Sequence, residues 1–474
     1  MSKAKIYYHD IGDYLSREEK LKIIKDFKSM SNLPLKVLKP NEHGDWINKR
    51  NDAFETFIPM APEKKFDMKS QSFFNTYAIG VATNRDDWVY NSSIQKLENN
   101  MKNFIAFYNE QQFKYQKEKA LNDKLKVDDF IDTNPEKIKW TVNLKKDLEK
   151  GLHHNYLNKE IITGLYRPFF KQYLYFDRPF IERPGLSPRF FPNKKLENLV
   201  ITVSGVSASK SFSVLLSNYI PDLQVQFNGQ YFPLYYYEER EKANPGLFDA
   251  AGDSEYVRRD GVSDFIWERA KKQYGKNVGK EDIFYYVYGI LHSEDYRNTF
   301  ENDLKKMLPR LPLVEDVRDF WKFSKAGRKL AELHLNYEEV PPYEGVEVSG
   351  ASEEAFQLNP DLYKVQKMRF PKRDQKDKII YNSKIELNNI PEKAYGYVVN
   401  GKSAIEWLMD RYQVKTDKKS GITNDPNDWA KEHDKPRYIL DLLLSIINVS
   451  VQTVDIVADL PKMEFEDETE ENVL

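Results

Sequence analysis

The spacing of the apolar residues changes along this chain, and that change limits its possible folds more than any other feature. Between 92 and 118 apolar side chains recur every three or four residues, the period of an amphipathic helix. They are Ile94, Leu97, Met101, Phe104, Ile105 and Tyr108. From about 136 to 250 the sequence instead has short apolar runs bounded by turn residues, which is typical of strands. Helical spacing returns at 281–306, 315–334, 402–412 and 436–448. We therefore predict an α+β fold with a mixed, β-rich core flanked by helices.

Four runs in the middle of the chain predict individual strands. They are 199–204, closed by Gly205, and 212–216, 223–227 and 230–237. Asn228 and Gly229 stand between the last two runs, and Asn-Gly is a strong signal for a tight hairpin turn. The sequence therefore predicts a hairpin with Asn228 at its tip.

The first residues predict a capped helix. Ser16 and Glu19 have the spacing of a capping box, and Leu21, Ile24 and Phe27 fall on one stripe of the helix that follows. At the other end, the residues from Pro461 onward are strongly acidic, and we expect them to be disordered.

Composition removes several kinds of chemistry. The chain has 474 residues and no cysteine, which excludes disulfides, thiol nucleophiles and Cys-ligated zinc. No apolar run approaches the roughly 18 residues of a membrane-spanning helix, and the first residues do not have the pattern of a signal peptide. We therefore expect a cytoplasmic protein.

Charge is unevenly distributed although the formal net charge is only −2. Residues 161–210 contain eight Lys or Arg against three acids, and residues 367–378 contain six against two. Such segregation permits a local anion-binding face on a nearly neutral protein. Charge runs are more often solvated surfaces, so this observation alone does not indicate nucleic acid.

The sequence lacks the motifs of DNA-modifying enzymes. An amino-group methyltransferase needs a donor loop rich in glycine and an [Asn/Asp/Ser]-Pro-Pro-aromatic loop that accepts hydrogen bonds from the flipped base. The nearest segment runs from Val340 to Tyr343, but valine offers no acceptor, so we interpret it as a rigid turn. We find no nucleotide-binding P-loop, no G-x-S-x-G elbow and no Mg²⁺-binding nuclease motif. His153 and His154 have no third ligand nearby, so no metal site is expected there.

Several collinear segments resemble the C-terminal part of Type ISP restriction-modification enzymes. These large single chains join nuclease, translocating ATPase, methyltransferase and target-recognition regions. The segments are 6–14 (IYYHDIGDY), 42–48 (EHGDWIN) with 50–52 (RND), 83–91 (TNRDDWVYN), 166–169 (YRPF), 175–178 (YFDR), 181–184 (IERP), 288–297 (YGILHSEDYR) and 309–313 (PRLPL). None is specific alone, but their joint order is. Residues 283–313 also resemble the helix and exit that close a recognition domain in Type I specificity subunits.

The resemblance implies a division of the chain. Residues 1–62 would be the C-terminal remnant of a methyltransferase domain, and 63–135 a helical connector. Residues 136–460 would form the target-recognition domain, followed by a disordered acidic tail at 461–474. The methyl-donor and base-flipping loops of the family are absent from this sequence.

A recognition domain needs cations for phosphates and polar side chains for base edges. Residues 183–231 offer both, and we expect their loops to face DNA. The candidate contacts are Arg183, Arg189, Lys194, Lys195, Ser207, Ser209, Lys210, Asn228 and Gln230. Asn228 and Gln230 could pair with adenine from the hairpin tip, although Asn228 also suits a turn that needs positive φ.

The predicted function is sequence-specific recognition of double-stranded DNA in bacterial defence. The resemblance implies that catalysis is carried elsewhere, on methyltransferase, ATPase and nuclease regions of the same parental or a neighbouring polypeptide. S-adenosylmethionine, ATP and Mg²⁺ would belong to those partners, and we expect no cofactor and no catalytic residue here. One alternative is a subunit that completes an adenine-N6 DNA methyltransferase in trans; another is an inert remnant of a truncated gene.

Overall fold

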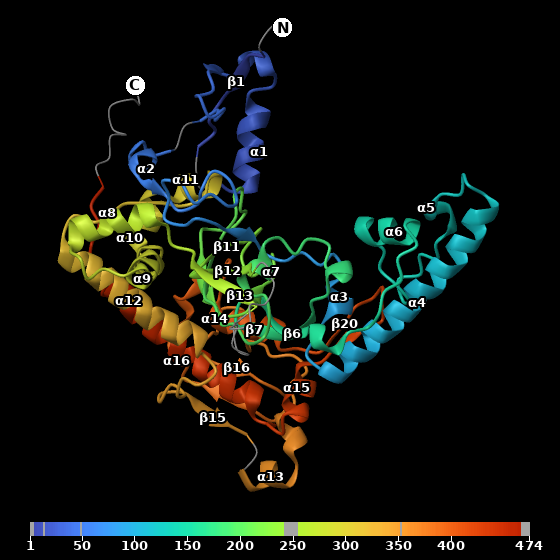
Figure 1. The fold of residues 1–474 in the computed structure, drawn as a ribbon. Coiled ribbons are helices and arrows are strands. Elements are labelled where there is room, and N and C mark those ends of the chain that lie inside the picture. The colour runs from blue at the N-terminus through green and yellow to red at the C-terminus, as the bar shows by residue number, and fades with distance from the viewer. Residues whose placement is uncertain (1–3, 13–14, 48–49, 241–254, 351–352, 466–474) are drawn as a thin grey trace, which may run out of the picture.

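The computed structural model describes residues 4–12, 15–47, 50–240, 255–350 and 353–465. Helices flank a central group of small sheets (Figure 1), in agreement with the predicted α+β fold. The helices are α1 (Arg17–Asp26), α2 (Ala53–Thr56), α3 (Asp86–Val89), α4 (Ile94–Leu121), α5 (Val127–Phe130), α6 (Val142–Glu149), α7 (Ser187–Phe190), α8 (Asp264–Tyr274), α9 (Lys280–Ile290), α10 (Glu294–Thr299), α11 (Glu301–Lys306), α12 (Val317–Leu335), α13 (Glu353–Leu358), α14 (Ala404–Arg411), α15 (Pro426–Glu432) and α16 (Tyr438–Ala458).

Two four-stranded sheets lie at the centre. One has the order β4 (Ala78–Ile79), β11 (Gln230–Pro233), β8 (Val200–Val203), β9 (Val214–Ser217) and is antiparallel throughout. We call it the recognition sheet. The other has the order β10 (Ile220–Pro221), β6 (Ile161–Arg167), β7 (Phe170–Tyr175), β5 (Tyr90–Asn91), in which only β10 and β6 are parallel.

The remaining strands form small sheets of two or three strands. They are β1 (Ile6–Tyr8) with β2 (Lys36–Leu38), β3 (Ile58–Pro59) with β14 (Arg310–Leu311), β12 (Tyr235–Glu239) with β13 (Tyr256–Asp260), β15 (Glu347–Ser349) with β17 (Glu386–Asn388) and β16 (Ile379–Ile380), β18 (Val398–Val399) with β19 (Lys402–Ser403), and β20 (Lys415–Thr416) with β21 (Thr423–Asn424).

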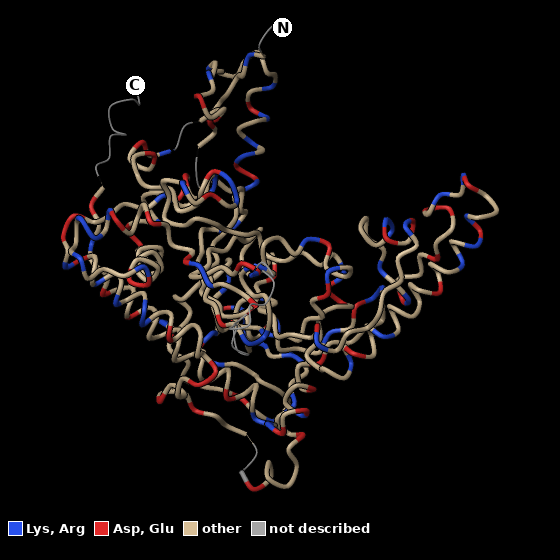
Figure 2. Tube along the Cα trace, in the orientation of Figure 1, with Lys and Arg blue, Asp and Glu red and all other residues tan. Residues whose placement is uncertain are grey.

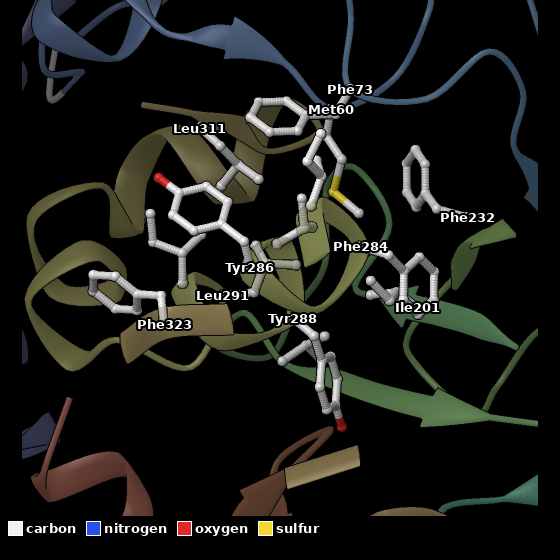
Figure 3. Close-up of a cluster of buried hydrophobic side chains, with 14 of the residues drawn as sticks. Met60, Phe73, Ile201, Phe232, Phe284, Tyr286, Tyr288, Leu291, Leu311 and Phe323 are labelled. Carbon is white, nitrogen blue, oxygen red and sulfur yellow. The ribbon is translucent and has the colours of Figure 1, made fainter. Parts of the chain in front are cut away.

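Strand alternation gives the recognition sheet two buried faces. Ile201 and Val203 of β8 point into a large core, where they meet Phe232 of β11 and Phe284 of α9 (Figure 3). Val200 points the other way and packs with Tyr231 and with Phe190 of α7. The sheet is therefore held between helices on one side and the α7 segment on the other.

Helices α9 and α12 approach each other closely beside this core. A Cβ atom on Gly289 would overlap the backbone oxygen of Phe323, and one on Gly327 would overlap the backbone oxygen of Tyr285. Only glycine permits this separation of the two backbones. The helices thereby form a rigid support beneath β8 and β9.

A second core lies around α16. Ile446, Ile447 and Val449 of this helix pack with Leu408 of α14 and Val399 of β18. The helix is long and apolar enough to cross a membrane by length and composition, but 67% of its most apolar window is buried inside the protein. It is therefore accounted for as a core helix, although the sequence analysis found no run of this character.

A third core joins α4 to the sheet that contains β6 and β7. Leu97, Met101 and Phe104 of α4 pack with Leu174 and Phe180. The predicted helix at 92–118 is thus confirmed, and its apolar stripe has a defined partner.

In the large core, Phe54 and Met60 pack with Ile201, so that core extends across the expected boundary at residue 62. The division into domains stays a prediction.

Two predicted elements differ from the structure. The helix expected at 281–306 is divided into α9, α10 and α11, because the Ser293 hydroxyl accepts a hydrogen bond from Tyr296 N and starts a new helix. The strand expected at 230–237 is divided into β11 and β12. β11 pairs with β8 and β4, whereas β12 pairs with β13.

The N-terminal helix has its predicted cap but no buried face. Ser16 and Glu19 form the capping box of α1. Leu21 and Ile24, however, remain 56% and 57% exposed, and Tyr7 and Val37 of the small β1–β2 sheet are exposed as well. The apolar stripe of α1 therefore meets no core among the described residues. Of the tail expected to be disordered at 461–474, residues 461–465 are described, and Met463 and Phe465 pack on the large core, so the expectation is wrong for them; residues 466–474 lie outside the described ranges.

Candidate nucleic-acid interface

The predicted contact residues lie at both ends of strand β8. Lys194 and Lys195 precede this strand, whereas Ser207, Ser209 and Lys210 follow it. Strand β8 has four residues, and the two groups leave it at opposite ends. We call Ser207, Ser209, Lys210 and Asn228 the loop-end group, and Arg189, Lys194 and Lys195 the helix-end group.

The loop-end group is held together by a contact between two loops. Gly205 begins the loop after β8, and its amide donates to Phe227 O at 2.9 Å. A Cβ atom on Gly205 would overlap the backbone oxygen of Asn228. The loop of residues 205–211 therefore lies directly against the turn of residues 226–229, as the prediction of one DNA face requires.

The hairpin prediction for Asn228 is wrong, although the turn itself is present. Residues 223–227 form turns and no strand, and β11 instead pairs with β8 and β4. Asn228 has φ of +47°, so its turn does use the left-handed conformation that Asn tolerates. An Asn-Gly pair identifies a turn but not the strands that pair beside it. Here Gln230 of β11 pairs with Val203 of β8, which lies 27 residues earlier in the chain.

A buried ion pair fixes the start of this turn. Arg167 Nη1 lies 2.7 Å from Asp222 Oδ1, and the same oxygen accepts from Gln224 N at 2.8 Å. Burial raises the pKa of the Asp222 carboxyl, and Arg167 opposes that shift. Because both side chains are largely enclosed, the pair sets the position of the chain that leads to Asn228.

A second pair of contacts comes from a distant turn that the sequence analysis missed. Asn400 Nδ2 donates to Gln224 O at 3.3 Å, and Asn400 N donates to Ser213 Oγ at 2.9 Å. The Lys210 side chain crosses over the neighbouring Gly401, where an added Cβ atom would lie 2.8 Å from Lys210 Cδ. The turn between β18 and β19 thus supports both loops of the loop-end group. In the sequence, the Asn400-Gly401 pair was the signal that could have indicated this turn.

The residues of the loop-end group are more exposed to solvent than Gln230. Ser207, Ser209, Lys210 and Asn228 are all exposed. Gln230 is partly buried, and its Oε1 is enclosed without a hydrogen-bond partner among the described residues. A two-point contact from Gln230 to a base would require its side chain to turn outward.

The helix-end group begins with an arginine that already has partners. Arg189 Nη2 lies 3.7 Å from Glu238 Oε1, and its guanidinium carbon lies 4.6 Å from the centre of the Phe66 ring. Glu238 also pairs with Arg259 at 3.0 Å. Arg189 and Arg259 thus share one carboxylate.

Arg183, Lys194 and Lys195 are exposed. The backbone of Arg183 pairs with that of Ala82. Two residues earlier in the same segment, Gly80 N donates a hydrogen bond to Gly229 O, next to Asn228. Arg183 therefore lies on the side of the Asn228 turn. Lys and Arg are interspersed with Asp and Glu over the whole trace (Figure 2). Charge alone therefore does not mark one face of the molecule.

The segments considered for other chemistry have structural partners. His154 Nε2 lies 3.2 Å from Asp147 Oδ2, and Pro341 O accepts from Asn448 Nδ2 at 2.8 Å. Within the described ranges, Glu42, His43 and Glu55 are the group that could together hold a metal ion, but they are exposed and His43 already lies 2.9 Å from Glu55. The Val340–Tyr343 segment still lacks an acceptor in the position where a base-flipping loop needs one, so its residues do not fit methyl transfer.

The described residues thus form an α+β protein in which exposed polar loops adjoin a buried sheet. The family model described as "Type ISP C-terminal specificity domain" matches residues 72–442. The chain therefore belongs to the Type ISP C-terminal specificity domain family, as its sequence segments indicated. A comparison with curated proteins gave no match.

Three solved structures, two of them of Type ISP enzymes, have the same fold. A nuclease-deletion mutant of the Type ISP restriction-modification enzyme LlaGI, in complex with a DNA substrate mimic, is 38% identical over 98% of this chain, with a TM-score of 0.82. The ATP-dependent Type ISP enzyme LlaBIII, bound to DNA, is 37% identical over 98%, with a TM-score of 0.83. A DrdV–DNA complex is 26% identical over 97%, with a TM-score of 0.79. The chain spans 40%, 28% and 44% of the lengths of these three proteins.

Proposed function

We propose that this chain recognises one sequence of double-stranded DNA and directs methyltransferase and nuclease activities that are carried elsewhere. The observation that carries this proposal is the similarity of nearly the whole chain to Type ISP enzymes in DNA-bound structures, at 37–38% identity. The supported, exposed loop-end group gives that similarity a physical basis in this protein.

The two groups of predicted residues suit different parts of DNA recognition. Lys194 and Lys195 are exposed cations and suit phosphates, which position a protein without reading sequence. Asn228, Ser207 and Ser209 offer donors and acceptors that suit base edges. Because both groups adjoin strand β8, we expect them to contact one duplex.

Catalysis and its cofactors would belong to other parts of the system. Because the Val340 side chain cannot accept a hydrogen bond from a flipped base, we assign no methyl-transfer step to this chain. S-adenosylmethionine, ATP and Mg²⁺ would be bound by methyltransferase and ATPase regions of the parental or a neighbouring polypeptide. DNA recognition for restriction-modification also favours a cytoplasmic location.

The exposed apolar residues of α1 favour a second candidate function, completion of an adenine methyltransferase in trans. Leu21 and Ile24 on α1 and Tyr7 on β1 would be covered by a methyltransferase domain of which residues 1–62 form the end. Mixing this chain with such a domain and assaying methyl transfer distinguishes the two proposals. Restored, site-specific transfer supports completion in trans, whereas DNA binding without restored transfer supports a recognition module.

The direct test of the proposed function uses the purified chain and labelled duplexes in fluorescence anisotropy. We expect binding to duplex DNA in which the logarithm of the affinity falls linearly with the logarithm of the salt concentration, since phosphate contacts release counterions. Absence of binding at low salt, both alone and with the methyltransferase part, contradicts the proposal and favours an inert remnant.

A further inference from the structure

A cavity of about 190 Å³ lies between the β6–β7 hairpin and helices α15 and α16, away from the predicted DNA contacts. Its walls include the rings of Phe170, Tyr412, Trp429 and Tyr438. An apolar cavity of about 150 Å³ is known to hold benzene. This cavity therefore has room for one heterocyclic base, but not for its sugar and phosphate as well.

The aromatic walls are fixed by contacts with one another. The rings of Trp429 and Tyr438 have centroids 4.2 Å apart, and those of Phe170 and Tyr412 are 4.8 Å apart. At the rim, exposed His433 stacks on Trp429 at 4.0 Å with an interplanar angle of 14°. Aromatic walls of this kind favour a flat ligand, which can pack against the rings.

One enclosed amide in the cavity lacks part of its hydrogen bonding. Gln172 is 4% exposed, and its Nε2 donates to Ser92 Oγ at 3.3 Å. No hydrogen bond to Gln172 Oε1 is formed by the described residues, although both Gln172 and Ser92 line the cavity. Gln172 Oε1 is not fully enclosed, so water or a ligand in the cavity can reach it. This oxygen is therefore suited to accept a hydrogen bond from a ligand N–H group.

The charges in the cavity cancel. Lys171 Nζ lies 3.1 Å from Glu338 Oε2, and Glu338 Oε1 accepts from Tyr438 OH at 2.8 Å. A cationic ligand would meet the ammonium group and an anionic one the carboxylate. The cavity thus favours a neutral ligand that has both hydrogen-bond donors and acceptors.

We propose that this cavity binds a single neutral nucleobase against its aromatic walls, with an N–H group directed at Gln172 Oε1. Planarity, size, neutrality and an unmet acceptor are all properties that a nucleobase satisfies. The base can come from a free nucleoside or from a nucleotide turned out of a duplex, which is how other proteins read a base with aromatic and amide groups. This inference does not depend on the loop-end or helix-end groups.

Photocrosslinking with 5-iodouracil tests the proposal on the full, unaltered chain. One sample contains free 5-iodouridine, and the other a duplex with a single bulged 5-iodouracil; adducts are located by mass spectrometry. Adducts on Trp429 or Tyr438 from the nucleoside indicate a free ligand, and adducts from the bulged duplex alone indicate a base presented by DNA. Either result supports the proposal. Absence of adducts on cavity residues in both samples overturns it.

Calorimetric titration of whichever ligand crosslinks provides the second measurement. Gln172→Met keeps the side-chain length and removes the unmet acceptor, and we expect at least tenfold weaker binding. Gln111→Met is the matched control, since Gln111 is a buried glutamine on α4 that accepts from Asp132 N and does not line the cavity. Equal affinity of Gln172→Met and the unaltered chain contradicts the assignment of Gln172.

Discussion

Gly205 and Asn228 meet backbone to backbone at the end of the recognition sheet. A Cβ atom added to Gly205 would overlap the Asn228 carbonyl oxygen and lie 2.9 Å from its carbonyl carbon. This contact joins the loop after β8 to the turn before β11. It turns two polar segments that are separate in sequence into one surface.

Gly205→Ala is expected to destabilise the protein and disturb this surface. The new methyl group would have to displace backbone rather than a flexible side chain, so a loss of about 1–3 kcal/mol of unfolding free energy is expected. Urea denaturation measures the loss, with Gly279→Ala as control because an added Cβ there meets only the Asp282 carboxylate at 3.4 Å. Equal stability of the two variants would contradict the close contact.

Asn228→Gly is expected to relax sequence specificity while leaving the fold intact. Glycine accepts the +47° φ of this position, so the substitution removes only the side chain. If Asn228 reads a base edge, discrimination at one base pair should fall by about 1–3 kcal/mol. Binding to a set of single-base variants of the target measures it. The control is Asn389→Gly, which has a φ of +61° and lies outside the interface; it should leave discrimination unchanged. If Asn228→Gly instead weakens binding to all sequences equally, Asn228 does not read a base.

Replacing Lys194 and Lys195 together by Ala is expected to weaken binding to every duplex alike. Each phosphate contact contributes about 0.9 to the slope of log affinity against log salt, so the slope should fall by about two. Anisotropy titrations from low to high salt provide the slope. The control replaces exposed Lys124 and Lys126, next to α5, by Ala. An unchanged slope removes Lys194 and Lys195 from the interface.

Two buried histidines are expected to contribute less stability in acid, whereas Asp222, whose pKa burial raises to about 7, changes stability in the opposite direction. Burial lowers the pKa of His334 to about 3 and lowers the pKa of His292 well below its usual range, while Arg297 nearby adds to both shifts. His334 Nδ1 lies 2.6 Å from Tyr288 OH, and its Nε2 lies 3.0 Å from Thr453 Oγ1. The folded protein therefore keeps both rings neutral, whereas the unfolded chain takes up protons below about pH 6.5.

Each neutral ring thus makes its full contribution to the free energy of unfolding above pH 6.5, and this contribution decreases as the pH falls. At pH 5.5 the loss should be about 1.4 kcal/mol per histidine. Urea denaturation at pH 8 and pH 5.5 measures it in the unaltered chain, in His334→Gln and in the exposed control His153→Gln. His334→Gln should reduce the pH dependence, because one proton-binding site of the unfolded chain is gone. The same pH dependence in all three proteins would refute this account.

The local elements were largely predictable from the sequence. The 3- and 4-residue spacing identified α4 and α12, and the apolar run at 199–204 identified β8, because these signals depend on neighbours along the chain. The pairing of β11 with β8 was not predictable, since it joins Gln230 to Val203 across the two intervening strands β9 and β10. Turn chemistry at Asn228 and Gly229 specified backbone conformation but not partners.

The candidate site was predictable only in part for the same reason. Residues 205–211 and Asn228 were identified together from their polarity, and the fold brings them into contact. The support from Asn400 and Gly401 is about 170 residues further along the chain than Asn228, so no local pattern connects them. Which of these residues contact DNA stays a prediction.

Selection from random duplexes tests the central claim most directly. The purified chain is incubated with a library of random double-stranded DNA, and bound molecules are recovered and sequenced over several rounds. We predict enrichment of one defined sequence, either with the chain alone or with the methyltransferase part added. Recovery of a library without any enriched sequence under both conditions would contradict the claim that this protein specifies a target.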